Sequence, residues 1–245
     1  MNTLQFLLLF LSVLGGGLIA MQLKNHSQNT LRLVLSFSGA YLLGITSIHL
    51  LPEAFNHSSH TVGYWILGGF LLQLVLEMLS KGVEHGHIHP EHSVSKTFVI
   101  PIMIGLFVHA FIEGIPLGPD DLFHAHDHGD ESGHAHNSLF YGIILHKLPA
   151  AFALATLLQL SGFSKSMTVL CLVVFGSASP LGAWLGSMLE LDHSQFQNLL
   201  GLVIGTFLHI STTILFEADE KSHHHISGKK LLAILGGLGL AILTL

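Results

Sequence analysis

The stretch FVHAFIEGIPLG, residues 107–118, places a histidine and a carboxylate inside an otherwise apolar segment. His109 and Glu113 are four residues apart, so in a helix both side chains project from the same face. A charged group at the centre of a membrane helix costs roughly 2.5 to 3.5 kcal/mol on insertion scales. Such groups are therefore rarely placed there without a use, and this pair is the first candidate site.

The composition around this stretch is that of a membrane protein. Of 245 residues, 50% are hydrophobic and only 10% are charged, whereas about 25% of residues in soluble domains are charged. The segment from Leu4 to Met21 lacks a basic start and an Ala-x-Ala-like cleavage site, so we interpret it as a retained first span. Cys171 is the single cysteine, which excludes an internal disulfide and a multi-cysteine metal site.

Windows of about 20 apolar residues predict eight membrane-spanning helices. The predicted spans are 3–21, 30–51, 61–80, 98–118, 138–160, 166–189, 196–216 and 229–245. Glycine pairs within them, such as Gly68-Gly69 and Gly236-Gly237, indicate close crossings of helices. The chain is thus predicted to be one all-α membrane domain over residues 1–245, with the lipid bilayer as its main partner and no nucleic acid.

The basic residues predict the orientation of the chain. Eight of the nine lysines and arginines flank odd-numbered loops, and the ninth, Lys147, lies inside a span. By the positive-inside rule, the odd loops are cytoplasmic and both termini are extracytoplasmic, with the cytoplasmic (plasma) membrane as the expected location. Acidic residues gather beside the even-numbered loops, where negative charge raises the local concentration of cations.

Histidine is the compositional outlier, with 20 residues against 9 lysines and arginines together. Polar, His-rich loops are predicted at 81–97 and 217–228 on the cytoplasmic side and at 119–137 on the extracytoplasmic side. Candidates for collecting metal outside are His124, His126, Asp127, His128, His134 and His136. Candidates for accepting metal inside are His85, His87, His89 and His92. Clustered imidazoles favour metal binding, and a solvated loop with incidental histidines is the alternative.

Two adjacent predicted spans carry ionisable groups at similar depth. His109 and Glu113 of the fourth span and His146 of the fifth form the predicted site, because imidazole and carboxylate suit a divalent transition metal. Pro116 and Pro149 are expected to interrupt these two helices and free backbone carbonyl groups. Further ionisable residues are accessory candidates, for which hydrogen-bonded packing is the alternative: His49, Glu53, Glu77 and His209.

These motifs resemble the ZIP family of divalent metal transporters. HAFIEG at 109–114 resembles the His-x-x-x-Glu-Gly motif of the fourth helix, and HKLPA at 146–150 resembles the His-x-x-Pro pattern of the fifth. Further matches begin at His49, Ser179 and Gly205. The resemblance implies a bundle of three, two and three helices, in which helices 1–3 and 6–8 are inverted repeats around helices 4 and 5. It also implies uptake of Zn²⁺ into the cytoplasm by alternating access, and Fe²⁺, Mn²⁺, Co²⁺ and Cd²⁺ are open alternatives as substrates. No organic cofactor is expected, and a homodimer is a candidate assembly.

The sequence departs from the family pattern where many members hold a second ion. The residues at those positions are Ala110, Lys147, Ala150 and Ser179. Lys147 places an ammonium group where the second ion would sit, and repulsion at about 4 Å is already a few kcal/mol per unit charge at an effective dielectric near 20. We therefore predict one metal ion, with Lys147 paired to Glu113. A branch of the family is similar in carrying this His-Lys pair.

Three other functions are open at this point. An intramembrane metallohydrolase needs a metal-activated water and a general base, but the His-Glu-x-x-His pattern is absent and Lys147 is a poor base, so we predict no enzymatic activity. A membrane protein that senses metal without transporting it would use the same ligands. An exporter of the same fold would differ only in the direction of transport.

Overall fold

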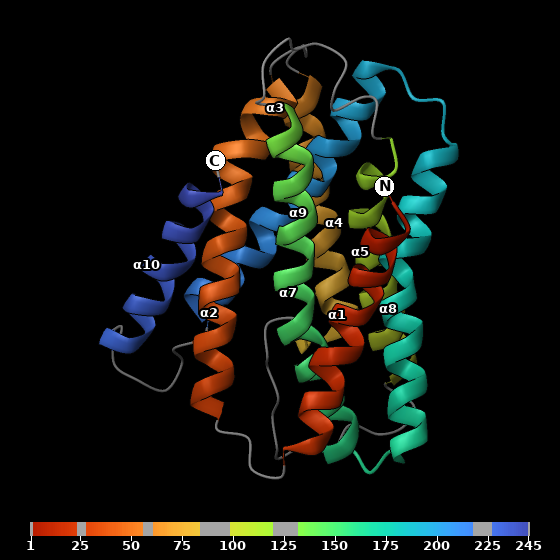
Figure 1. Cartoon of the computed structure of the whole chain (residues 1–245), viewed down its shortest axis with the longest axis vertical. Coiled ribbons are helices and arrows are strands. Elements are labelled where there is room, and N and C mark those ends of the chain that lie inside the picture. Colours follow the sequence, from red (N-terminus) through yellow and green to blue (C-terminus); the bar gives the residue numbers. More distant parts are fainter. Residues whose placement is uncertain are drawn as a thin grey trace.

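A computed structural model describes residues 2–23, 28–55, 61–83, 99–119, 132–217 and 227–244. These residues form an all-helical bundle without strands (Figure 1). The helices are α1 (Thr3–Gln22), α2 (Gln28–Ile45), α3 (Leu51–Phe55), α4 (Thr61–Ser80), α5 (Val99–Gly114), α7 (Ser132–Leu160), α8 (Lys165–Met188), α9 (His193–Glu217) and α10 (Gly228–Leu243). A π-helical turn, Thr46–Leu50, joins α2 to α3, and a 3₁₀ turn, Ile115–Leu117, follows α5. Each predicted span corresponds to one helical rod, which is a single helix or, for the second and fourth spans, a run of consecutive helical segments. The all-α prediction is confirmed.

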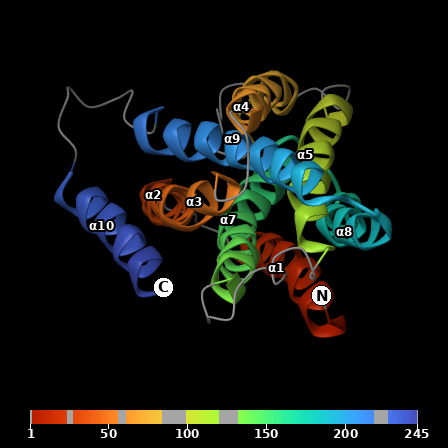
Figure 2. The same ribbon diagram turned by 90° about the horizontal axis from the view of Figure 1, so that it is seen from above.

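Seven rods in the described ranges are long and apolar enough to cross a membrane. The eighth predicted span corresponds to α10, which has 16 residues and is about 24 Å long at 1.5 Å per residue. This is shorter than the hydrocarbon core of a bilayer, which is about 30 Å thick. α10 lies at the edge of the bundle beside α2 (Figure 2). The chain is an integral, multi-pass membrane protein.

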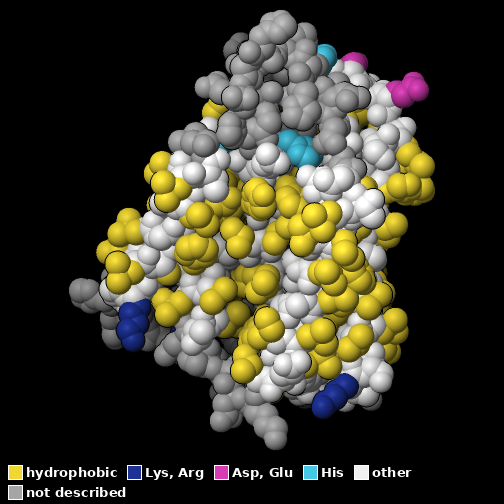
Figure 3. Space-filling view, viewed as in Figure 1, with side chains coloured by type: hydrophobic (Ala, Val, Ile, Leu, Met, Phe, Trp, Pro, Cys, Tyr) yellow, Lys and Arg dark blue, Asp and Glu magenta, His cyan; other side chains and the backbone are white. Residues whose placement is uncertain are grey.

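Charged side chains lie at two opposite ends of the bundle, separated by a largely apolar surface (Figure 3). Lys165 begins α8, whereas Glu190 and Asp192 follow its other end, and all three are exposed. Both chain ends lie in the same half of the molecule (Figure 1). The assignment of that half to the extracytoplasmic side stays a prediction.

The contacts between helices follow the predicted inverted repeat. Helices α1, α2 and α4 would correspond to α8, α9 and α10, so the pair α4–α9 should have a counterpart in α10–α2. Both pairs pack extensively. Each has a glycine at its crossing, since a Cβ at Gly69 would overlap the Leu202 carbonyl oxygen and a Cβ at Gly237 would overlap that of Phe37. Small residues of this kind let membrane helices approach closely.

Pro116 interrupts its helix as predicted, whereas Pro149 does not. Pro116 lies in the 3₁₀ turn that ends α5, but α7 continues as one helix through Pro149, so the predicted interruption there is wrong. Membrane helices tolerate proline where neighbouring groups satisfy the freed backbone. α1 packs closely beside this proline, since a Cβ at Gly16 would overlap the Leu148 carbonyl oxygen. A further irregular turn, which was not predicted, is the π-helical turn before Pro52, where the Leu51 N–H donates to the Thr46 carbonyl.

α7 begins within the loop that was predicted for 119–137. His136 is buried in this helix with 4% of its surface exposed, and its Nε2 lies 3.4 Å from the Leu117 carbonyl oxygen. The placement of His136 in a loop is therefore wrong, and its role in collecting metal stays a prediction. Several predicted loop residues have side chains outside the described residues: His85, His87, His89, His92, His124, His126, Asp127, His128 and His134.

Candidate metal site

The three predicted ligands lie on two helices in the buried interior. His109 and Glu113 occupy successive turns of α5, and His146 lies on α7 beside Lys147. Each of these four residues is at most 2% exposed. α5 packs mainly on α8 and α7 packs mainly on α1, so these polar side chains help to bridge α5 and α7.

Glu113 is the centre of the cluster. Its Oε1 lies 2.6 Å from Lys147 Nζ, and its Oε2 lies 3.2 Å from His109 Nε2. The Ser179 hydroxyl of α8 lies 3.3 Å from Oε1 and donates a 2.6 Å hydrogen bond to the Ala110 carbonyl. The predicted ion pair between Lys147 and Glu113 is therefore confirmed. Both carboxylate oxygens have a polar neighbour, as a fully buried charge requires.

His146 approaches His109 from the other helix. The two ring centroids are 6.0 Å apart and the rings are nearly perpendicular, at 85°. Two imidazoles bound to one tetrahedral zinc ion, with Zn–N bonds of about 2.1 Å, place their ring centroids roughly 5 Å apart. Across the described ranges, no three His, Cys, Asp or Glu side chains are grouped tightly enough to hold an ion. A three-ligand site would need the two rings to approach by about 1 Å and Lys147 to leave Glu113.

Lys147 has a second neighbour beside the carboxylate. Its Nζ lies 4.9 Å from the centroid of the Phe175 ring of α8, within the range of a cation–π interaction. At the other predicted second-site positions, Ala110 and Ala150 are buried and carry no ligand atom. The ammonium group therefore lies between one carboxylate and one aromatic face.

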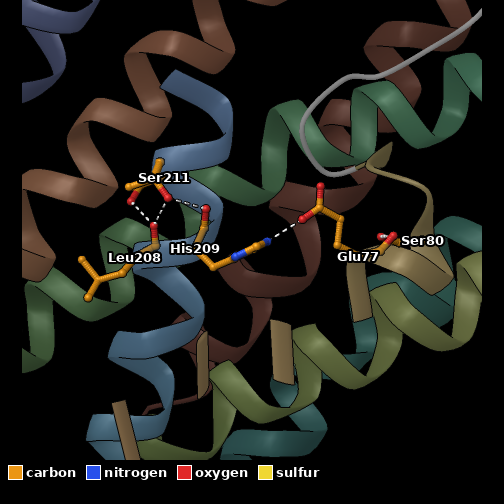
Figure 4. Close-up of polar contacts among 6 residues, drawn as sticks. Glu77, Ser80, Leu208, His209 and Ser211 are labelled. Carbon is orange, nitrogen blue, oxygen red and sulfur yellow. Dashed lines mark hydrogen bonds and ion pairs between the residues drawn. The ribbon is translucent and has the colours of Figure 1, made fainter. Parts of the chain in front are cut away.

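The accessory candidates lie at other contacts between helices. His209 Nε2 of α9 lies 2.5 Å from Glu77 Oε2 of α4 (Figure 4), and Phe70 packs its ring against His209 at a centroid distance of 4.8 Å. His49 Nε2 in the π-helical turn lies 3.4 Å from the Ala241 carbonyl oxygen of α10. Glu53 is partly exposed in α3. Sequence reasoning named Glu77 and His209 separately and missed that they form a pair.

An all-helical bundle with paired inverted-repeat contacts and a buried imidazole–carboxylate cluster defines a multi-pass membrane protein with an internal polar site. The family model described as ZIP Zinc transporter matches residues 80–244. This match covers more than half of the chain, and the chain belongs to the ZIP family. The predicted family is thereby confirmed.

Named relatives agree with this assignment. Zinc transporter ZIP9-B of Xenopus laevis is 29% identical over 174 residues, which is 67% of this chain and 55% of that protein. Zinc transporter ZIP9 of Micropogonias undulatus is 29% identical over 174 residues, which is 67% of this chain and 54% of that protein. Zinc transporter ZupT of Akkermansia muciniphila is 27% identical over 257 residues, covering 94% of this chain and 91% of that protein. The chain thus spans about half the length of the ZIP9 relatives that it matches.

Proposed function

We propose that this protein carries a divalent transition-metal ion, foremost Zn²⁺, across a membrane through a single site made by His109, Glu113 and His146. The observation that carries the proposal is the buried contact between His109 and Glu113, with His146 facing it from α7. Imidazole nitrogen and carboxylate oxygen are zinc ligands. The names of the relatives, which are zinc transporters, support the same substrate.

The proposed mechanism is alternating access. A metal ion from the acidic end of the bundle reaches the site, takes the place of Lys147 at Glu113 and draws the two imidazoles together by about 1 Å, toward zinc-ligand geometry. Helices α5 and α7 then shift against the other helices, and the ion leaves toward the basic end. By the positive-inside rule the basic end is cytoplasmic and both termini are extracytoplasmic, so movement from the acidic to the basic end is uptake into the cytoplasm, across the plasma membrane.

One ion is expected in the site at a time, because Ala110, Ala150 and Ser179 carry no charged ligand and Lys147 adds a positive charge. Fe²⁺, Mn²⁺, Co²⁺ and Cd²⁺ carry the same charge and accept the same ligand types, so they are expected to compete with zinc. The proposal includes no organic cofactor and no enzymatic step. The proposed assembly is a homodimer.

Radioactive zinc uptake into sealed proteoliposomes tests this function. The parent protein should accumulate zinc, whereas His109→Ala and Glu113→Ala should lose at least nine-tenths of the rate. Lys165→Met, at the exposed start of α8, is the control and should transport like the parent. Parental rates in both site variants would show that the ion passes elsewhere. Zinc binding without any flux in the parent would favour a sensor, and flux only from inside to outside would favour an exporter.

A further inference from the structure

We propose that the Lys147 ammonium group is a tethered counter-cation that lets the metal-free carrier reorient, so that net transport needs it and metal-for-metal exchange does not. This inference rests on the proposed function and concerns the same site. It assigns to Lys147 a positioning role: the residue binds no metal and acts by holding Glu113 when no metal is bound.

The first argument is the burial of the charge. Glu113 is 0% exposed and its Oε1 lies 2.6 Å from Lys147 Nζ. An ionised carboxylate that loses its partner in such surroundings is strongly disfavoured, because neither water nor another charge compensates it. Among the charged side chains of the described cluster, one carboxylate faces one ammonium group. The cluster is therefore electrically balanced in the conformation seen.

The second argument follows from the transport cycle. A carrier that moves net cargo must pass through its two facing states once with the ion and once without it. With the ion bound, the metal compensates Glu113 and repels the ammonium group. Without the ion, the carboxylate still has to move within the low-dielectric interior, and Lys147 is the cation that accompanies it. Exchange of one metal ion for another never uses the metal-free step.

The third argument is that a buried aromatic ring lies close enough to interact with the ammonium group when the metal displaces it. Phe175 is 1% exposed, and the centroid of its ring lies 4.9 Å from Nζ. An aromatic face attracts a cation most strongly where water is excluded. A small rotation of the lysine side chain therefore moves the charge from the carboxylate toward the ring, without taking the charge out of the protein.

The test compares two fluxes of radioactive zinc at one fixed pH. Net uptake is measured into zinc-free proteoliposomes, and exchange is measured into vesicles loaded with unlabelled zinc. Lys147→Met keeps a side chain of similar length but removes the charge, so the ratio of exchange to net uptake should rise at least tenfold. The zinc Kd, measured by calorimetry, should fall at least tenfold. Slow release from a tighter site lowers both fluxes, so the ratio isolates the metal-free step.

Three further variants complete the test. Lys147→Arg keeps the charge and should bring the ratio back toward that of the parent, whereas Lys147→Gln keeps a hydrogen-bond donor without charge and should behave like Lys147→Met. Lys165→Met removes an exposed lysine elsewhere and should leave both fluxes unchanged. A parental ratio in Lys147→Met and Lys147→Gln, or an equal loss of both fluxes in variants that still bind zinc, would overturn the proposal. Absence of both fluxes in the parent would instead overturn the proposed function.

Discussion

Glu113 and Lys147 form a buried ion pair, and removing either charge alone should strongly destabilise the protein. At the observed 2.6 Å separation, the attraction of two unit charges is about 6 kcal/mol at an effective dielectric near 20. Much of this gain is offset by the desolvation of both groups, so the pair itself contributes less. Leaving one partner buried alone costs about 3–5 kcal/mol. Glu113→Gln and Lys147→Met should each therefore destabilise the protein by that amount.

For a chain of this length, about 1 kcal/mol corresponds to roughly 2–4 °C in the melting temperature. Each single variant should then melt about 6–20 °C below the parent. The double variant Glu113→Gln, Lys147→Met leaves neither charge unpaired and should recover at least half of that loss. This recovery measures the coupling between the two contacting residues, and a recovery of this size is expected if each single variant leaves one buried charge uncompensated.

The chain provides its own reporter for this measurement. Cys171 is the single cysteine and is buried, with 8% of its surface exposed. A thiol-reactive fluorophore should label it only as the detergent-solubilised protein unfolds. Lys165→Met is the control and should shift the transition by no more than about 0.5 kcal/mol, as exposed substitutions do. Single variants that melt within 2 °C of the parent, or a double variant less stable than both singles, would refute the reasoning.

Three further predictions address the surroundings of the site. Ser179→Ala removes the hydroxyl that donates to the Ala110 carbonyl at 2.6 Å and should cost about 1 kcal/mol in thermal unfolding. Ser177→Ala, which loses only a bond to Val174 within the same helix, should cost less, and equal losses would contradict a special role for Ser179. Gly69→Val should destabilise the α4–α9 crossing, because a side chain there overlaps the Leu202 carbonyl. Gly68→Val is the control and should be nearly neutral by the same assay, because nothing lies within 4 Å of a Cβ at Gly68. Zinc uptake should fall as the pH decreases from about 7.5 to about 5.5, because protons compete with the metal for imidazole nitrogens, and uptake that rises over this range in a pH series on proteoliposomes would contradict ligation by His109 and His146.

The rods and the His109–Glu113 pair were predictable because both depend on short-range patterns. An apolar window is a property of about 20 consecutive residues, and two side chains four residues apart share a helix face whatever lies around them. The pairing of Lys147 with Glu113 was also predictable, since a buried ammonium group needs a carboxylate and the neighbouring span offers Glu113. Charge, spacing and length therefore predicted the fold and the centre of the site.

The remaining features depend on which helix faces which, and a single sequence does not contain that information. Glu77 and His209 are 132 residues apart and meet only because α4 crosses α9. His136 was assigned to a loop because of its polar neighbours, but it lies inside the bundle, beside the carbonyl of Leu117 in the 3₁₀ turn after α5. α7 continues through Pro149, although the local sequence predicted an interruption there. The first two features depend on tertiary contacts that a local pattern does not encode.

The two histidine–carboxylate contacts differ in how far the carboxylate is buried. His109 contacts Glu113, whose side chain is 0% exposed, and His209 contacts Glu77, whose side chain is 19% exposed. A fully buried carboxylate needs a fixed positive charge to compensate it. Lys147 supplies that charge at Glu113.

In the proposed single-ion site, Lys147 balances Glu113 when no metal is bound and repels a second ion. Replacing Lys147 alone leaves Glu113 uncompensated, and adding a carboxylate at Ala150 or Ser179 alone adds a buried negative charge. A two-ion site therefore requires these changes together, and either change alone should destabilise the protein.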